Sequence, residues 1–227
     1  MRRLLVAAVV GGAAVAGCAS APAAAAARPL LAAARATIDR TPALHFVLAS
    51  QNLPAVGTTL QGGSGDLARP DQLEGTFQVS LDGLPASVKL IEAGGKFFAE
   101  LPFTGHYQVT DPARFGLGDP AQLLNPGTGV SRLLTELGGS SVAGRRRVGG
   151  EVVEEISGAV PGADVAGLLP DVDPAEAVRL VLDIDPASHQ VRQVALTGPF
   201  ARPAVASTYV VTLTGYGEAV TIDQPPT

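Results

Sequence analysis

The sequence has no tryptophan, a single cysteine, and few aromatic residues among its 227 positions. One thiol cannot form an intramolecular disulfide, so a folded domain here depends on burial and hydrogen bonding. Charged residues make up only 16% of the chain, and the formal net charge is −5. This balance excludes the large basic surface that nucleic-acid binding requires. The apolar residues are mostly Ala, Val and Leu, which predicts an aliphatic core with smooth walls.

The longest apolar run, residues 4–16, is too short to span a bilayer, which takes roughly 18 or more residues. It follows two arginines and ends at Val15-Ala16-Gly17-Cys18. Small residues before a cysteine, after a cationic start and a short apolar run, are typical of a lipoprotein signal peptide. We therefore predict that residues 1–17 are removed and that the thiol of Cys18 is acylated. The protein would then be anchored to the cell membrane on its extracytoplasmic side. The alternative is an ordinary secretory signal with a chance cysteine.

The rest of the chain is interpreted as a tether and one domain of the α+β class. Residues 18–27 are Ala-rich and predict a tether, and residues 28–227 predict the domain. Helical spacing over residues 28–40 indicates a first helix, and further helical patterns begin at Thr128 and at Asp164. Alternating apolar residues in short segments such as 76–82, 178–184 and 208–214 predict strands joined by Gly, Pro and Asp turns. This pattern predicts an antiparallel sheet with one covered face.

Catalysis is not expected from the residues present. The candidate bases are His45, His106 and His189, and the sequence has no Gly-x-Ser-x-Gly segment to present a nucleophile beside one of them. The acidic pair Asp171 and Asp173 lies in a proline-flanked turn, where a helix cap or solvation explains it. We predict no catalytic residue, no metal and no cofactor.

The segment that precedes the central helix reads Asp119-Pro120-Ala121-Gln122-Leu123-Leu124-Asn125-Pro126-Gly127-Thr128-Gly129. It resembles the corresponding segment of a family of mycobacterial and related actinobacterial lipoproteins, the LppX/LprG family. Further matches cover most of the mature chain: residues 45–50, 65–67, 148–150, and 213–218 with Pro225-Pro226. Tyr216 stands where the family usually has Trp.

The resemblance implies a strongly curved antiparallel sheet, a half-barrel similar in shape to the carriers of the Lol lipoprotein-sorting system. Helices would cover its concave face around an apolar cavity. It also implies binding of di- or triacylated lipids or glycolipids and their transfer across the envelope, beside an export transporter. An acyl chain of about 16 carbons resists transfer into water by roughly 12 kcal/mol, at about 0.8 per CH₂, so such a lipid needs a protein that offers hydrocarbon of its own.

The apolar faces that would line such a cavity come from both strands and helices. Periodicity alone cannot distinguish them from a solid core, which would leave a structural or adhesive surface lipoprotein as the alternative function. The expected lining residues are Val47, Phe77, Val79, Leu81, Val88, Leu90, Phe97, Leu123, Val130, Leu133, Leu134, Leu137, Val178, Leu180 and Leu182.

Arg145, Arg146 and Arg147 form the sharpest cluster of charge in the sequence. They could contact the phosphates of a lipid head group or of the membrane surface. The alternative is a solvated hairpin end, because three charges fall short of the clusters of roughly 4–8 that indicate lipid binding.

Overall fold

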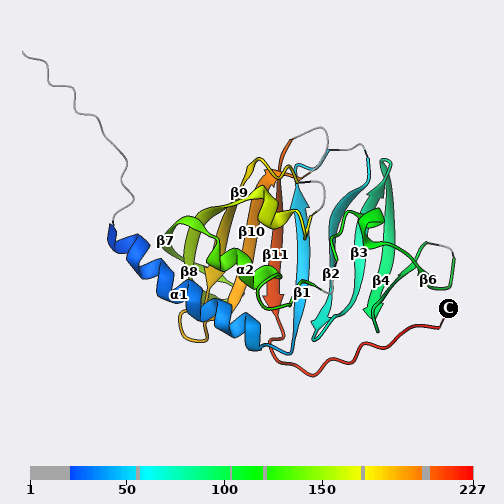
Figure 1. The fold of residues 1–227 in the computed structure, drawn as a ribbon, viewed down its shortest axis with the longest axis horizontal. Helices are drawn as coiled ribbons and strands as arrows, with labels where there is room; N and C mark the ends of the chain where they lie inside the picture. The colour runs from blue at the N-terminus through cyan, green and yellow to red at the C-terminus, as the bar shows by residue number, and fades with distance from the viewer. Residues whose placement is uncertain are drawn as a thin grey trace, which may run out of the picture.

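The computed structural model describes residues 21–54, 57–102, 104–119, 122–169, 172–200 and 205–226. The expected signal peptide and Cys18 lie outside these residues. A curved, 11-stranded antiparallel sheet forms one layer, and short helices and loops lie across its concave face (Figure 1). The strands are β1 (Ala43–Gln51), β2 (Thr59–Ala68), β3 (Gln72–Leu81), β4 (Leu84–Ala93), β5 (Lys96–Glu100), β6 (Gln108–Val109), β7 (Gly138–Val148), β8 (Glu151–Pro161), β9 (Ala177–Ile184), β10 (Val191–Pro199) and β11 (Ala206–Thr214).

The sheet consists of two meanders joined by the first and last strands. Its order is β6-β5-β4-β3-β2-β1-β11-β10-β9-β8-β7, and β1 pairs with β11 from His45↔Thr214 to Gln51↔Thr208. Strand β2 bends sharply, with a register shift between Leu60 and Gly62. Its Gly65 lies directly opposite Gly75 of β3, where a Cβ would collide with the carbonyl oxygen of Glu74. Glycine is therefore required where β2 and β3 approach each other this closely.

Helix α1 (Ala21–Arg40) begins seven residues before the predicted start at Arg28. The Ala-rich segment predicted as tether is therefore largely helical, which suits the high helix propensity of alanine. Ala27 is fully buried, and it lies on the same packed face as Leu31, Ala34 and Ile38. The helix packs against β7 and α2 (Figure 1). It ends as predicted before Thr41-Pro42, where the Thr41 hydroxyl donates to the Thr37 carbonyl at 2.8 Å.

The other helical segments are shorter than the sequence pattern predicts. The helix expected from Thr128 to the glycines at 138–139 is α2 (Val130–Thr135), and those glycines begin β7. The turn expected at Asp164–Leu169 is α3 (Gly162–Val165) and the loop that follows it. A 3₁₀ turn, η1 (Pro112–Phe115), lies between β6 and α2. Tertiary packing against the sheet, and not intrinsic propensity, stabilises helices this short.

The two faces of the sheet carry different cores. The concave face holds the main cluster, in which strand residues such as Phe77, Val88 and Leu180 are almost fully buried. The convex face holds a small cluster around Ile91 and Phe98, which Ile222 of the C-terminal segment covers. Alternation along the strands thus separates two layers of apolar contact. Among the described residues, no helix combines the length and hydropathy needed to cross a membrane.

Candidate functional site

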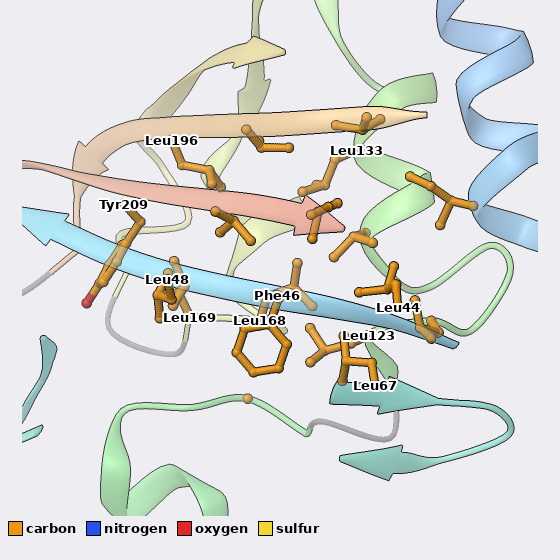
Figure 2. A pocket seen from close by; sticks show the side chains of 18 of the residues that line it. Leu44, Phe46, Leu48, Leu67, Leu123, Leu133, Leu168, Leu169, Leu196 and Tyr209 are labelled. Atoms are coloured by element: carbon orange, nitrogen blue, oxygen red, sulfur yellow. The ribbon is translucent and has the colours of Figure 1, made fainter. Parts of the chain in front are cut away.

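An apolar cavity lies between the concave face of the sheet and the segments that cover it. Figure 2 shows lining side chains from β1, β10, β11 and α2, together with Leu123, Leu168 and Leu169 from the covering loops. The lining residues are Ile38, Leu44, Phe46, Leu48, Leu60, Leu67, Leu73, Phe77, Leu117, Gly118, Asp119, Leu123, Leu124, Val130, Leu133, Leu134, Leu168, Leu169, Leu180, Leu182, Val191, Val194, Leu196, Tyr209, Val211 and Leu213.

The chemistry of the wall is that of hydrocarbon. Asp119 is the one charged residue among the lining residues, and its side chain lies at the exposed margin, where it accepts a hydrogen bond from Gln122 Nε2 at 3.4 Å. The Tyr209 hydroxyl donates to the Leu60 carbonyl at 2.9 Å, which satisfies its polar atom. A cavity of this kind favours an apolar ligand because it offers almost no hydrogen-bonding group to a polar one.

The cavity has room for about one acyl chain. The volume of the cavity, counted as the space open to the centre of a water molecule, is about 180 Å³. A single water needs roughly 10–15 Å³ of such space, so the cavity holds at least about a dozen water-sized groups. Because a methylene group is of similar size, this corresponds to most of one fatty tail. A lipid with more chains requires the covering loops to move apart.

The two ends of the cavity differ in closure. At one end, which we call the closed end, α1 meets β1, and the lining residues at this junction, Ile38 and Leu44, are buried. Arg69 secures this junction, because its guanidinium donates to the carbonyls of Ile38 and Thr41 at 3.1 and 2.9 Å. Toward the other end, which we call the open end, Leu48, Leu168 and Leu169 in the lining are partly exposed.

Two covering loops meet across the cavity through one backbone hydrogen bond. The Gly118 amide donates to the Leu168 carbonyl at 2.9 Å, and Leu117 and Leu169 on either side line the cavity. The approach is so close that a Cβ on Gly118 would collide with the carbonyl oxygen of Gly167. In contrast, a Cβ on Gly167 would meet nothing within 4 Å.

The structure places the predicted lining residues in three groups: in the wall of the cavity, in the core away from the cavity, and, for Val47 alone, on the convex face. Phe77, Leu123, Val130, Leu133, Leu134, Leu180 and Leu182 lie in the wall of the cavity. Val79, Leu81, Val88, Leu90, Phe97, Leu137 and Val178 pack in the same core but away from the cavity. Alternation indicates the dry face of a strand, whereas the position along the curved sheet decides whether a side chain meets a neighbour or the cavity.

Val47 was predicted on the wrong face. Its side chain is 45% exposed on the convex side, and its neighbours Phe46 and Leu48 line the cavity instead. A one-residue slip in register moves a strand residue to the opposite face of the sheet. The sequence around β1 carries apolar residues on both faces, so alternation there gave no clear phase.

The wall contains many residues that the sequence analysis missed. Strand β2 contributes Leu60 and Leu67, but its glycines interrupt the alternating pattern that would have identified them. Tyr209, Val211 and Leu213 of β11 alternate cleanly, and this signal could have assigned them to the inner face. The loop leucines at 117, 168 and 169 follow no periodicity, so only the fold brings them to the cavity.

The three arginines lie on the edge strand β7 and not at the cavity. Arg145 pairs with Glu154 at 2.7 Å, and the Arg147 side chain donates to the Gly150 carbonyl at 2.8 Å. Arg146 forms an ion pair with Asp183, whose side chain is buried on the convex face. This hydrogen bond raises the pKa of the Arg146 guanidinium. The cluster is thus largely satisfied within the chain, as expected for a protected edge strand.

The histidines are dispersed. His45 Nδ1 lies 2.8 Å from Asp66 Oδ1, His106 contacts the Thr104 carbonyl at 2.8 Å, and His189 sits in the β9–β10 turn. Asp171 lies outside the described residues. Asp173 Oδ1 accepts from the Ala175 amide at 2.9 Å, as a turn cap does. Within the described ranges, no three His, Cys, Asp or Glu residues are grouped so as to hold a metal.

Near the end of the fold, Tyr216 is held by burial and one hydrogen bond. Its hydroxyl donates to the Val191 carbonyl at 2.8 Å. Burial raises the pKa of this phenol above its usual range, so the hydroxyl remains a donor at any physiological pH. Tyr216 packs against the main core, where it fills the position at which a larger ring was expected from the resemblance.

Relatives of known role match almost the whole chain. The lipoarabinomannan carrier protein LprG of Mycobacterium tuberculosis (strain H37Rv) is 29% identical over 234 residues, which cover 99% of this chain and 96% of the relative. The LprG of Mycobacterium leprae is 25% identical over 187 residues, covering 80% of this chain and 74% of that protein. These relatives are carriers and belong to a non-enzymatic family.

Solved structures show the same fold at low sequence identity. LprF from Mycobacterium bovis superposes with a TM-score of 0.74 at 16% identity, covering 89% of this chain and 98% of that one. LppX from Mycobacterium tuberculosis gives a TM-score of 0.63 at 15% identity, covering 90% and 100%. The sequence model described as LppX_LprAFG lipoprotein matches residues 26–222. The chain therefore belongs to the LppX_LprAFG lipoprotein family.

Proposed function

We propose that this protein is a membrane-anchored carrier that holds acyl chains of lipids or glycolipids in its cavity and moves them through the cell envelope. Acylation of Cys18 would supply the anchor. An export transporter would be a partner that delivers or receives the lipid. The head group would remain in water, outside a cavity whose wall is almost entirely apolar.

The apolar cavity carries this proposal. A hydrocarbon-lined space that side chains do not fill costs stability, because the lining residues lose contacts that a packed core would make. A curved sheet closed by Arg69 at one end, with loops that meet through one hydrogen bond, resists collapse and still offers an entrance. The relatives named as lipoarabinomannan carriers support a glycolipid as the cargo.

Extraction of the purified protein tests the proposal. The full chain, isolated from its membrane in mild detergent, is extracted with organic solvent, and the extract is analysed by mass spectrometry. Co-purifying di- or triacylated lipid, together with uptake of a fluorescent fatty acid by the extracted protein, is the expected result. A clean extract and no uptake would instead support a structural or adhesive lipoprotein.

The anchor is tested separately. Mass spectrometry of the N-terminal peptide is expected to show a diacylglyceryl group on Cys18 and no residue before it. An unmodified cysteine within an intact N-terminus would contradict the anchor but would leave the cavity proposal standing.

A further inference from the structure

The two ends of the half-barrel differ in how far their most exposed apolar side chain reaches into solvent: Leu84 at the open end is 73% exposed, and Val152 at the closed end is 46% exposed. At the closed end, the chain reverses through Arg69-Pro70-Asp71, through the glycines that precede Lys96, and through the polar segment 185–190. At the open end, β1 ends at Gln51, the turn Asp82-Gly83 joins β3 to β4, and β11 begins at Ala206. The alternating strand directions place the end of β1, the turn between β3 and β4 and the start of β11 at the same end of the sheet, at the top of Figure 1.

The open-end turns expose apolar side chains that the fold leaves uncovered. Leu84 is 73% exposed, the largest value among the exposed large apolar side chains of the described residues, and Pro85 beside it is also exposed. Val205, immediately before β11, is 42% exposed, and β3, β2 and β1 lie between β4 and β11 in the sheet. Asp82 and Gly83 adopt positive φ angles of 50° and 84°, a tight turn that holds Leu84 at the tip of the hairpin.

Resting on the proposed function, we propose that the open end docks on a lipid bilayer, with Leu84 and Val205 inserted among the lipid acyl chains. The cavity reaches the open end at β2 and β11, where Leu60 and Tyr209 line it. A lipid tail could then leave the bilayer for the cavity while little of it meets water. Each methylene exposed on the way costs about 0.8 kcal/mol, so direct contact of the two apolar phases lowers the barrier.

The position of α1 is consistent with this orientation. The helix ends at the closed end of the sheet and begins beyond the β7 edge, farther from the closed end (Figure 1). Only two residues separate Cys18 from the first helical residue, Ala21. An acylated Cys18 would therefore hold the closed end away from the membrane and leave the open end free to reach it.

Depth-dependent quenching tests the insertion directly. Leu84→Cys in the full chain is labelled with a polarity-sensitive fluorophore and reconstituted into phosphatidylcholine–phosphatidylglycerol vesicles that carry doxyl-labelled chains. Lys96→Cys, in an exposed turn of the closed end, is the matched control, and the unsubstituted chain reports any label on Cys18. Quenching and a blue shift at position 84 but not at position 96 are expected. Equal emission at both positions would overturn the proposal.

Transfer kinetics separate docking from cavity binding. Leu84→Ser should fold normally, because the side chain is already exposed, and should slow transfer of a fluorescent phospholipid between vesicles roughly tenfold. Its uptake of a dispersed fluorescent fatty acid should remain unchanged. Val152→Ser, which removes a 46% exposed apolar side chain at the closed end, should leave both rates unchanged.

Each outcome has a distinct meaning. Equal vesicle transfer by the Leu84→Ser and Val152→Ser variants would refute docking through the open end. Failure of the unsubstituted chain to take up fatty acid at all would refute the proposed function, while the quenching experiment would still decide whether the open end enters a bilayer.

Discussion

Replacing Val211 by tryptophan should abolish acyl-chain binding without unfolding the protein. Val211 lies on β11 in the middle of the concave face, where it lines the cavity and pairs with Val194 of β10. Tryptophan adds roughly seven non-hydrogen atoms, which would occupy about half of a space that holds about a dozen water-sized groups. At about 0.8 kcal/mol per CH₂, excluding about seven methylenes weakens binding by 5–6 kcal/mol, or about four powers of ten.

The assay is titration with a fluorescent fatty acid, with circular dichroism and thermal unfolding to report the fold. The adjacent residue supplies a matched control. Val210→Trp makes the same substitution one position earlier, on the convex face, and should bind fatty acid like the unsubstituted chain. Normal binding by the folded Val211→Trp variant would refute the assignment of the cavity as the lipid site. Loss of binding in both variants would trace the effect to the strand and not to the cavity.

Two further predictions concern the covering loops and the turn between β9 and β10. Gly118→Ala should break the hydrogen bond to Leu168, lower the free energy of unfolding by about 1–3 kcal/mol and speed fatty-acid uptake in stopped-flow measurements, whereas Gly167→Ala should change neither. Equal uptake rates would show that these loops do not limit access. The Ser188 hydroxyl donates to Asp185 and is the main cause of that carboxyl's lowered pKa. A carboxyl whose pKa is lowered in the folded state stabilises the protein above its ordinary pKa, and this stability is lost as the pH falls through the folded-state pKa. In urea titrations, Ser188→Ala should therefore lower the free energy of unfolding by less than about 1 kcal/mol at pH 7 and should have no effect near roughly pH 2. A larger deficit at acid pH would contradict this account.

The strand prediction was most accurate where one face is dry and the other wet. In β3, Phe77 and Val79 are buried while Gln78 between them is exposed, as the alternation indicates. In β9, Val178, Leu180 and Leu182 are buried on the predicted face. The α+β class and the antiparallel order followed from these short alternating segments and their turns. The end of α1 before Thr41-Pro42 could also be predicted from the sequence, because proline cannot continue a helix.

The prediction was wrong where local pattern and packing disagree. Alanine-rich residues before Arg28 resemble a tether by composition, yet Ala27 is buried because its small side chain lets α1 approach its neighbours. Val47 lies in a strand with apolar residues on both faces, so its direction depends on the register of β1 with β2 and β11. These decisions are made by contacts between segments far apart in the chain.

The sequence by itself determined the dry faces of cleanly alternating strands such as β3 and β9, the aliphatic chemistry of the interior and, through its resemblance, the family. It did so because periodicity and composition are local properties that a single segment already carries. Only the tertiary structure decided which dry side chains face a cavity and which face each other. That choice depends on the curvature of the sheet and on two loops that meet across it, and both arise from backbones approaching over long sequence distances.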